Sequence, residues 1–369
     1  MLKIGDKMRA RKLVLCGSIM LPTLLCAVEE NFTILDNLDL LSAIKMEKIG
    51  YLFAHGLGAT QEQSSLFLPT SIKKWLINKP AVLFDFPDSK SNNMEYYNAK
   101  VNLGQELDIQ RFDTIFHKAI TRLTDYKFIL SGISRGAATI INYVALNHPE
   151  QISALVLESP FDTLINIIKH LLRRFHVSWI PFSKKIAFKI AKKHFPLLNP
   201  NGIFPIKVIN RIPSTLPILF IHSRNDRTIP INSSRNLYKS LIQAGHHNAY
   251  IFELASGDHG KLMLGDESEL YKNVVHAFYK RYHLPHDPFS AQLGEPMLKY
   301  CQPTLDEINK RIRRNRSSDD LIFENDIDDM YEELTQFDEE IMNIQLEDLF
   351  KRENLLVKNS PALELKILI

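Results

Sequence analysis

Short, nearly continuous apolar runs alternate with amphipathic stretches from Ile49 to Tyr282, and this alternation constrains the fold of the 369-residue chain most strongly. Such runs predict strands that are buried on both faces, as in a mostly parallel sheet whose crossovers are helices. The sequence before Ile49 offers no good strand candidate. The expected strands are 49–55, 81–86, 127–131, 152–158, 217–222 and 249–254, and helices are expected near 64–77, 107–123, 136–147, 233–244 and 269–282. We therefore predict an α/β fold with a mostly parallel central sheet flanked by helices.

The first 27 residues have the order of charges and apolar residues that is typical of a secretory signal peptide. Basic residues between Lys3 and Lys12 precede an apolar run over residues 13–27. The run is shorter than the roughly 20 residues that span a bilayer and is interrupted by Pro22, which favours cleavage. The alternatives are an uncleaved anchor and a buried helix. We expect an exported chain, periplasmic or secreted, whose mature form keeps only Cys301 and no internal disulfide.

A basic segment, residues 161–212, departs from the alternating pattern. Helical spacing would place most of its lysines on one face: Lys184, Lys185, Lys189, Lys192 and Lys193. This face is either the solvated side of a covering helix, or part of a lid that contacts an anionic substrate or a membrane surface.

Beyond Leu284 the chain changes character again, since Pro285 and Pro288 break the last expected helix. Residues 285–369 are expected to form a linker and an acidic, amphipathic helical extension whose protein partner is unknown. The expected organisation is a signal segment at 1–27, one domain at 28–284 with the lid-like segment 161–212, and the extension. Hydrophobic content of 45% permits a full core, and the net charge of +3 gives no indication of nucleic-acid binding.

The pattern G-x-S-x-G at residues 132–136 carries the strongest chemical signal. It follows an apolar strand and precedes a helix, and this order makes a sharp turn that lifts the hydroxyl of Ser134 above the sheet at the positive end of a helix dipole. The glycines remove side chains where the turn packs closely. The alternative is an ordinary strand-to-helix turn with a surface serine.

A hydroxyl becomes a good nucleophile when a base accepts its proton, and an acid must orient that base. Asp226 follows the apolar run 217–222, and His259 follows the run 249–254, so both lie on loops at the carboxyl edge of the predicted sheet. We therefore predict a triad of Ser134, Asp226 and His259. Asp258 and Asp266 are weaker candidates for the acid.

Two backbone N–H groups are needed to stabilise the oxyanion, and those of Leu57 and Arg135 are expected to supply them. Leu57 lies in the loop after an early strand, and Arg135 follows the serine. His55 is expected to be a structural histidine more than a chemical one. A metal site made by His55, His222, Asp226 and His259 is disfavoured because these residues lack a compact ligand spacing.

These motifs together resemble the α/β-hydrolase superfamily over roughly residues 49–282. The stretch 221–230 resembles the acid loop of prolyl oligopeptidase-like, serine aminopeptidase-like and dienelactone-hydrolase-like members, although Ser223 stands where they usually have glycine. The stretch 55–58 is similar to their His-Gly oxyanion loop. Residues 85–91 are similar to their Asp-aromatic-x-Gly-x-Gly-x-Ser stretch, with both glycines replaced. The resemblance implies an α/β-hydrolase fold and leaves the substrate open.

The expected function is hydrolysis of an ester, thioester or amide through an acyl-enzyme on Ser134, without a metal or organic cofactor. Esterases and peptidases share these residues, so the sequence does not separate them. Arg135 and the basic segment favour an acidic or amphiphilic substrate. The alternative is a catalytically silent scaffold that binds a partner through its lid or extension. Deleting residues 285–369 is expected to discriminate, since a hydrolase would keep some turnover without them.

Overall fold

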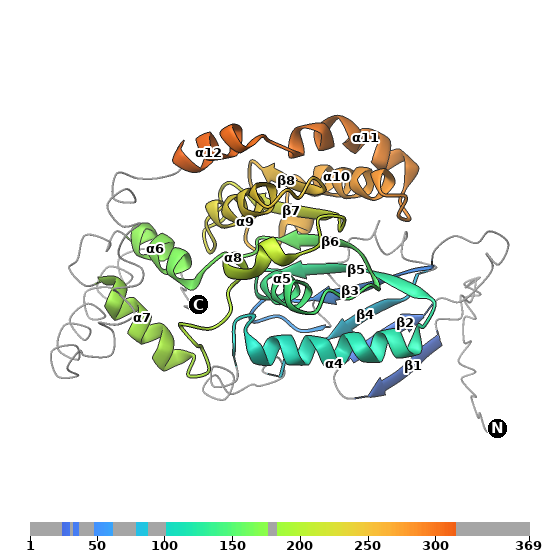
Figure 1. The fold of residues 1–369 in the computed structure, drawn as a ribbon, viewed down its shortest axis with the longest axis horizontal. Helices are drawn as coiled ribbons and strands as arrows, with labels where there is room; N and C mark the ends of the chain where they lie inside the picture. The colour runs from blue at the N-terminus through green and yellow to red at the C-terminus, as the bar shows by residue number, and fades with distance from the viewer. Residues whose placement is uncertain are drawn as a thin grey trace, which may run out of the picture.

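An eight-stranded sheet forms the centre of the molecule (Figure 1). The structure, a computed structural model, describes residues 24–29, 32–36, 48–61, 79–87, 101–175 and 183–314. The strand order is β1-β2-β4-β3-β5-β6-β7-β8, and every pairing from β4 to β8 is parallel. The strands are β1 Leu24–Glu29, β2 Phe32–Asp36, β3 Lys48–Ala54, β4 Ala81–Phe84, β5 Tyr126–Ile133, β6 Ile152–Glu158, β7 Ile218–Ser223 and β8 Ala249–Leu254. The predicted α/β fold with a mostly parallel sheet is confirmed.

The sequence before Ile49 offered no good strand candidate, but the structure has two strands there. β2 pairs antiparallel with β4, and β1 pairs antiparallel with β2, so both extend the sheet beyond β4. β1 begins inside the apolar run that we interpreted as a signal segment, so the strand was not expected there. The rest of that run, up to residue 23, lies outside the described residues. Within the described part of the chain, no helix is both long and apolar enough to cross a membrane.

Helices cover both faces of the sheet because alternate strand residues point to opposite sides. Leu52, Leu130 and Phe220 pack against helices of one face, which include α4 Glu106–Arg122, α5 Arg135–Asn147 and α9 Asn232–Gln243. Tyr51 and Ile129 face the other side, where α10 Ser268–Arg281 packs. These helices start and end within two residues of the predicted ranges. The expected helix at 64–77 lies outside the described residues.

The basic segment forms α6 Leu164–Arg174, α7 Ser183–His194, α8 Pro205–Val208 and the 3-10 turn η1 Ile209–Arg211. α6 and α7 lie together at one end of the molecule (Figure 1). Asp162, which is buried, anchors the start of α6: it accepts hydrogen bonds from Thr163 N and Asn166 Nδ2 and from Ser233 Oγ and Asn236 Nδ2 on α9. This anchor ties the lid-like segment to the helices that cover the sheet.

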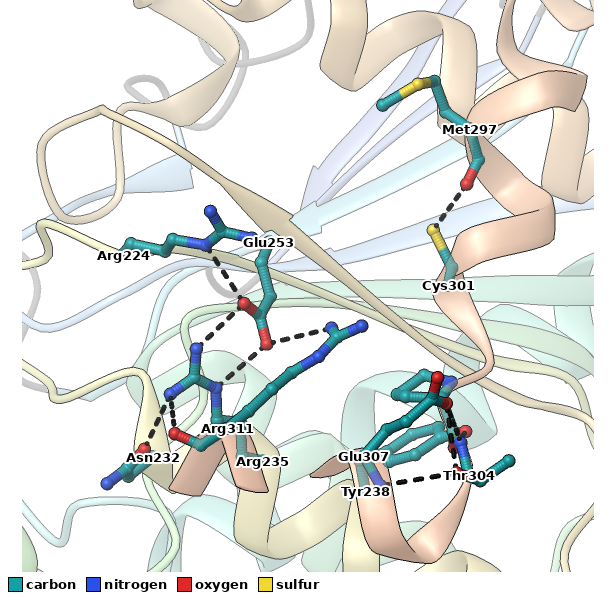
Figure 2. A network of polar contacts seen from close by, with 11 residues as sticks. Arg224, Asn232, Arg235, Tyr238, Glu253, Met297, Cys301, Thr304, Glu307 and Arg311 are labelled. Atoms are coloured by element: carbon teal, nitrogen blue, oxygen red, sulfur yellow. Dashed lines mark hydrogen bonds and ion pairs between the residues drawn. The ribbon is translucent and has the colours of Figure 1, made fainter. Parts of the chain in front are cut away.

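The predicted extension does not begin as a separate unit, since α11 Pro288–Leu298, η3 Lys299–Cys301 and α12 Leu305–Arg314 pack on the domain. Ile308 and Ile312 of α12 are buried in the core cluster, and α12 packs against α9. Figure 2 shows that the Glu253 carboxylate of β8 accepts hydrogen bonds from Arg235 of α9 and from Arg311 of α12. Arg235 also donates to the Arg311 carbonyl at 2.9 Å. The packed body therefore extends to Arg314, and the acidic helix expected after residue 319 lies outside the described residues.

Candidate active site

Ser134 lies at the junction of β5 and α5 in a backbone conformation that favours glycine. Its φ of 54° and ψ of −115° are strained for a residue with a side chain. The strain is held by a hydrogen bond on each side: Ser134 N donates to the Glu158 carbonyl at 2.8 Å, and Ala138 N donates to the Ser134 carbonyl at 3.0 Å. Ser134 is 8% exposed. Ser134 thus lies on a strained turn between a strand and a helix.

The two glycines of the G-x-S-x-G pattern are required by close backbone approaches. A Cβ atom on Gly136 would lie 2.1 Å from the Ala54 carbonyl oxygen of β3. A Cβ atom on Gly132 would lie 2.7 Å from Ala137 N at the start of α5. These contacts leave no space for a methyl group, so the pattern is what allows α5 to pack this tightly on the sheet.

Asp226 and His259 lie side by side on the loops after β7 and β8. His259 Nδ1 donates to Asp226 Oδ2 at 2.7 Å, and the other carboxylate oxygen, Oδ1, accepts Thr228 N and Ile229 N at 2.8 and 2.9 Å. The Asp226 side chain is fully buried, whereas that of His259 is 18% exposed. Asp258 and Asp266 are both exposed, and Asp226 is the acid that contacts the histidine.

A second histidine, His222 on β7, also supports Asp226. Its Nε2 lies 3.1 Å from the Ile229 carbonyl and 3.4 Å from Asp226 Oδ2, while Nδ1 lies 2.7 Å from Ser234 Oγ. Since a carbonyl only accepts, Nε2 carries the proton and Nδ1 accepts from the hydroxyl. Burial raises the pKa of Asp226, but the hydrogen bonds from His222 and His259 outweigh it and hold that pKa well below its usual range. The carboxylate is therefore ionised across the neutral range.

The loop after β3 lies against the serine. A Cβ atom on Gly56 would be 3.5 Å from Ser134 Cβ, and one on Gly260, beside His259, would be 3.4 Å from Ile133 Cγ2. The two loops therefore meet the elbow at one edge of the sheet. Among the described residues, no acceptor is found for the Leu57 N–H.

His55 has the structural role that its position suggested. Its Nδ1 donates to the Gly56 carbonyl at 2.8 Å, and its Nε2 accepts from Phe86 N at 3.3 Å. Asp85, the first residue of the motif 85–91, accepts Gln61 N at 2.7 Å. Residues 88–91 of that motif lie outside the described residues. Together these bonds fix the shape of the loop that carries Leu57.

The expectation that the Arg135 side chain favours an acidic substrate is wrong. The guanidinium is buried and forms a two-point ion pair with Asp108 of α4, with N···O distances of 2.7 and 2.6 Å. It also lies over the ring of Phe86, 4.3 Å from the centroid. Its charge is neutralised inside the fold, so only its backbone N–H remains a candidate for contact with substrate.

The basic face of α7 is also less available than the sequence implied. Lys192 Nζ donates to the carbonyls of Pro196 and Leu198, which holds the chain that leaves the helix. Lys185 and Lys189 are half-buried, and Lys193 is exposed. The side chain of Lys184 lies outside the description. Part of the lysine stripe therefore stabilises local structure.

Glu158, at the end of an expected strand, lies close to Ser134 and His259. Burial raises the pKa of its carboxyl to about 7. The available signal was an acid at the end of an apolar run, but its burial depends on neighbours from other elements.

Among the described residues, no three His, Cys, Asp or Glu side chains are grouped to hold a metal ion.

Comparisons with known proteins agree with this architecture. No protein-family model and no curated protein matches the chain. Among solved structures, the chain is similar to the esterase Pf2001 of Pyrococcus furiosus, with a TM-score of 0.50 and 18% identity over 68% of this chain and 85% of the esterase. It is also similar to an acylaminoacyl peptidase of Pyrococcus horikoshii, with a TM-score of 0.50 and 16% identity over 71% of this chain and 41% of the peptidase. The chain has the fold of the α/β-hydrolase superfamily.

Proposed function

We propose that the protein is a serine hydrolase that cleaves an ester, thioester or amide bond through an acyl-enzyme intermediate. The observation that carries the proposal is the 2.7 Å hydrogen bond between His259 Nδ1 and the buried Asp226 carboxylate. This pair lies at the sheet edge where Ser134 occupies its strained turn. Such a pair has the acid and base roles that activation of a serine requires.

In the proposed reaction, His259 Nε2 takes the proton of Ser134 Oγ as that oxygen bonds to the substrate carbonyl carbon. The tetrahedral oxyanion is stabilised by the N–H groups of Leu57 and Arg135, and each such donor is typically worth about 10²- to 10³-fold in rate. His259 returns the proton to the leaving group as the bond to it breaks. A water molecule, deprotonated by His259, then releases the acid and regenerates Ser134.

Apolar residues of the loops that carry Leu57 and Asp226 pack against the lid-like segment. Leu57 of the oxyanion loop and Ile229 of the acid loop belong to one apolar cluster with Leu164 and Ile168 of α6 and Phe188 of α7. We propose that this cluster contacts the acyl part of the substrate. The exposed Lys193 would favour an anionic group, or an anionic membrane surface, further out.

The test is covalent labelling by a fluorophosphonate probe, which reports an activated serine. Ser134→Ala and His259→Ala should abolish labelling. Ser159→Ala is the matched control: Ser159 also follows a parallel strand at this edge and has a φ of 46°. Among the described residues its hydroxyl has no hydrogen-bond partner, so the variant should label like wild type. A folded wild type that remains unlabelled would refute the proposal and favour the alternative of a catalytically silent binding scaffold.

We also propose that the apolar N-terminal segment directs export. The folded chain uses part of this segment, since Leu24, Leu25 and Cys26 pair with β2. Sequencing the N-terminus of protein recovered from the periplasm or medium tests the proposal. A mature chain that starts after Ala27 would support a cleaved signal, an intact exported chain would support an anchor, and retention of all the protein in the cytoplasm would refute export.

A further inference from the structure

Glu158 is a buried carboxyl that the proposed mechanism leaves unused, although it contacts the backbone of Ser134 and the turn that follows His259. It is the last residue of β6, and its main-chain oxygen accepts the Ser134 N–H. Its side chain is 2% exposed and reaches the 3-10 turn η2 Leu262–Leu264, where Leu262 N donates to Oε1 at 3.4 Å. That turn follows His259 closely in the sequence. One residue therefore touches both the nucleophile strand and the histidine loop.

The carboxyl of Glu158 faces a cavity of about 40 Å³ on the α10 side of the sheet. Gly132 and Ile133 of the nucleophile strand line it, together with Met263 of η2 and Tyr271 of α10. The second carboxyl oxygen, Oε2, is buried without a hydrogen-bond partner among the described residues. A buried ionisable group that lacks full compensation is costly, which is a common feature of groups kept for function.

Several neighbouring groups shift the pKa of the Glu158 carboxyl, and they lie on different elements. His259 on the loop after β8 favours the ionised carboxyl, and Asp226 on the loop after β7 opposes it. On α10, Tyr271 favours ionisation of the carboxyl, and Tyr51 and Tyr279 also line the cavity. Burial is the largest influence and raises the pKa of Glu158 to about 7. The charge of this residue is therefore set within the range where a histidine base titrates.

We propose that Glu158 is a second positioning acid for His259. Its carboxylate holds the η2 turn through the Leu262 N–H and places a negative charge behind the imidazole, which stabilises the imidazolium formed during acyl transfer. The inference rests on the proposed function. It differs from the role of Asp226, which binds the imidazole directly, because Glu158 acts through the turn and through its charge.

The test is the second-order rate of fluorophosphonate labelling between pH 5 and 9. Glu158→Gln keeps the shape and removes the charge. Loss of the negative charge makes the imidazolium less stable, so the pH of half-maximal labelling should move down by about one unit. Since one pK unit corresponds to a factor of ten, the rate at high pH should fall about tenfold. Glu158→Asp, which keeps the charge, should return the half-maximal pH towards the wild-type value.

Two further variants make the test independent of whether Glu158→Gln folds. Tyr271→Phe removes a hydroxyl that favours ionisation of Glu158, so less negative charge remains near His259 and the half-maximal pH should move downward, in the same direction as for Glu158→Gln but by less. Glu253→Gln alters an equally buried carboxylate on β8 that pairs with Arg235; it should lower the melting temperature and leave the pH profile unchanged.

Each outcome decides between a positioning role and a purely structural one. Labelling of Glu158→Gln with the wild-type half-maximal pH would overturn the inference, even if the variant is less stable. An unchanged profile for Tyr271→Phe would overturn it as well. An unlabelled wild-type protein would be a failure of the proposed function itself, and is distinguished from these outcomes because it needs no variant.

Discussion

Replacing Gly136 by alanine tests whether the close approach of α5 to β3 is what the G-x-S-x-G pattern provides. The new Cβ atom would lie 2.1 Å from the Ala54 carbonyl oxygen, 2.5 Å from its carbon and 2.7 Å from the His55 carbonyl oxygen. All three atoms belong to the backbone of β3 and its following loop. They can give way only if the end of the strand and the start of the helix separate by about 1 Å.

The expected cost of Gly136→Ala is at the upper end for overpacking. Inserted methyl groups typically destabilise a core by about 1–3 kcal/mol, and here no flexible side chain can absorb the clash. We expect about 3–4 kcal/mol, which in a domain of this size lowers the melting temperature by roughly 10 °C. Displacement of the Arg135 N–H should also suppress labelling of Ser134.

Two other glycines serve as controls for this prediction. Gly56→Ala would meet Ser134 Cβ at 3.5 Å, an ordinary contact, so its stability should change by less than about 0.5 kcal/mol. Gly245→Ala meets nothing within 4 Å but has a φ of 81°, so only about 1 kcal/mol of backbone strain is expected. Urea melts of the three variants provide the measurement. A Gly136→Ala protein as stable as Gly245→Ala would refute the reasoning.

Two further predictions concern buried carboxylates. Asp226→Asn should keep the fold but lower the labelling rate by about 10²- to 10⁴-fold, because the amide no longer orients the imidazole as its base form requires. The lowered pKa of Asp226 stabilises the fold at pH values above the unfolded pKa, near 3.9, and this stability is lost as the pH falls towards the lower folded value. Urea melts at pH 6 and pH 3 should therefore show the stability difference between wild type and Asp226→Asn shrinking at the lower pH; a constant difference would contradict the assigned shift. Asp162→Ala removes the acceptor of four hydrogen bonds, two from the start of α6 and two from α9. We therefore expect a loss of about 2–3 kcal/mol and faster proteolysis within α6 and α7, whereas Asp113→Ala on the exposed face of α4 should be neutral.

The parallel strands were predictable from the sequence because burial on both faces removes nearly every polar residue from them. The run 152–158 is an example, and β6 occupies those same residues. β1 and β2 were missed for the opposite reason: they lie at the edge of the sheet, where β1 is adjacent to β2 alone, and the apolar residues of β1 had another plausible interpretation. Edge strands carry a weaker pattern.

The pairing of Asp226 with His259 could be anticipated because chain order and the sheet edge bring those loops together. Contacts that do not follow from the chain order and the sheet edge could not. Asp108 lies 27 residues before Arg135, and nothing in the local pattern links them. Glu158 reads as an ordinary strand end, and its perturbed ionisation arises from burial beneath η2 and α10. Such properties depend on packing that local periodicity does not encode.

Gln302, between η3 and α12, has a consequence for where this chain can be shortened. β8 is the last strand in the sheet order, and the Gln302 amide donates to the carbonyls of His247 and Ala249 at its start. A side chain that occupies these groups blocks them from pairing with a strand of another molecule. Deleting residues 285–369 would therefore expose unpaired backbone groups of β8 and promote aggregation. A chain that ends after Arg314 keeps these groups covered, so it is the better one to compare with the full-length protein.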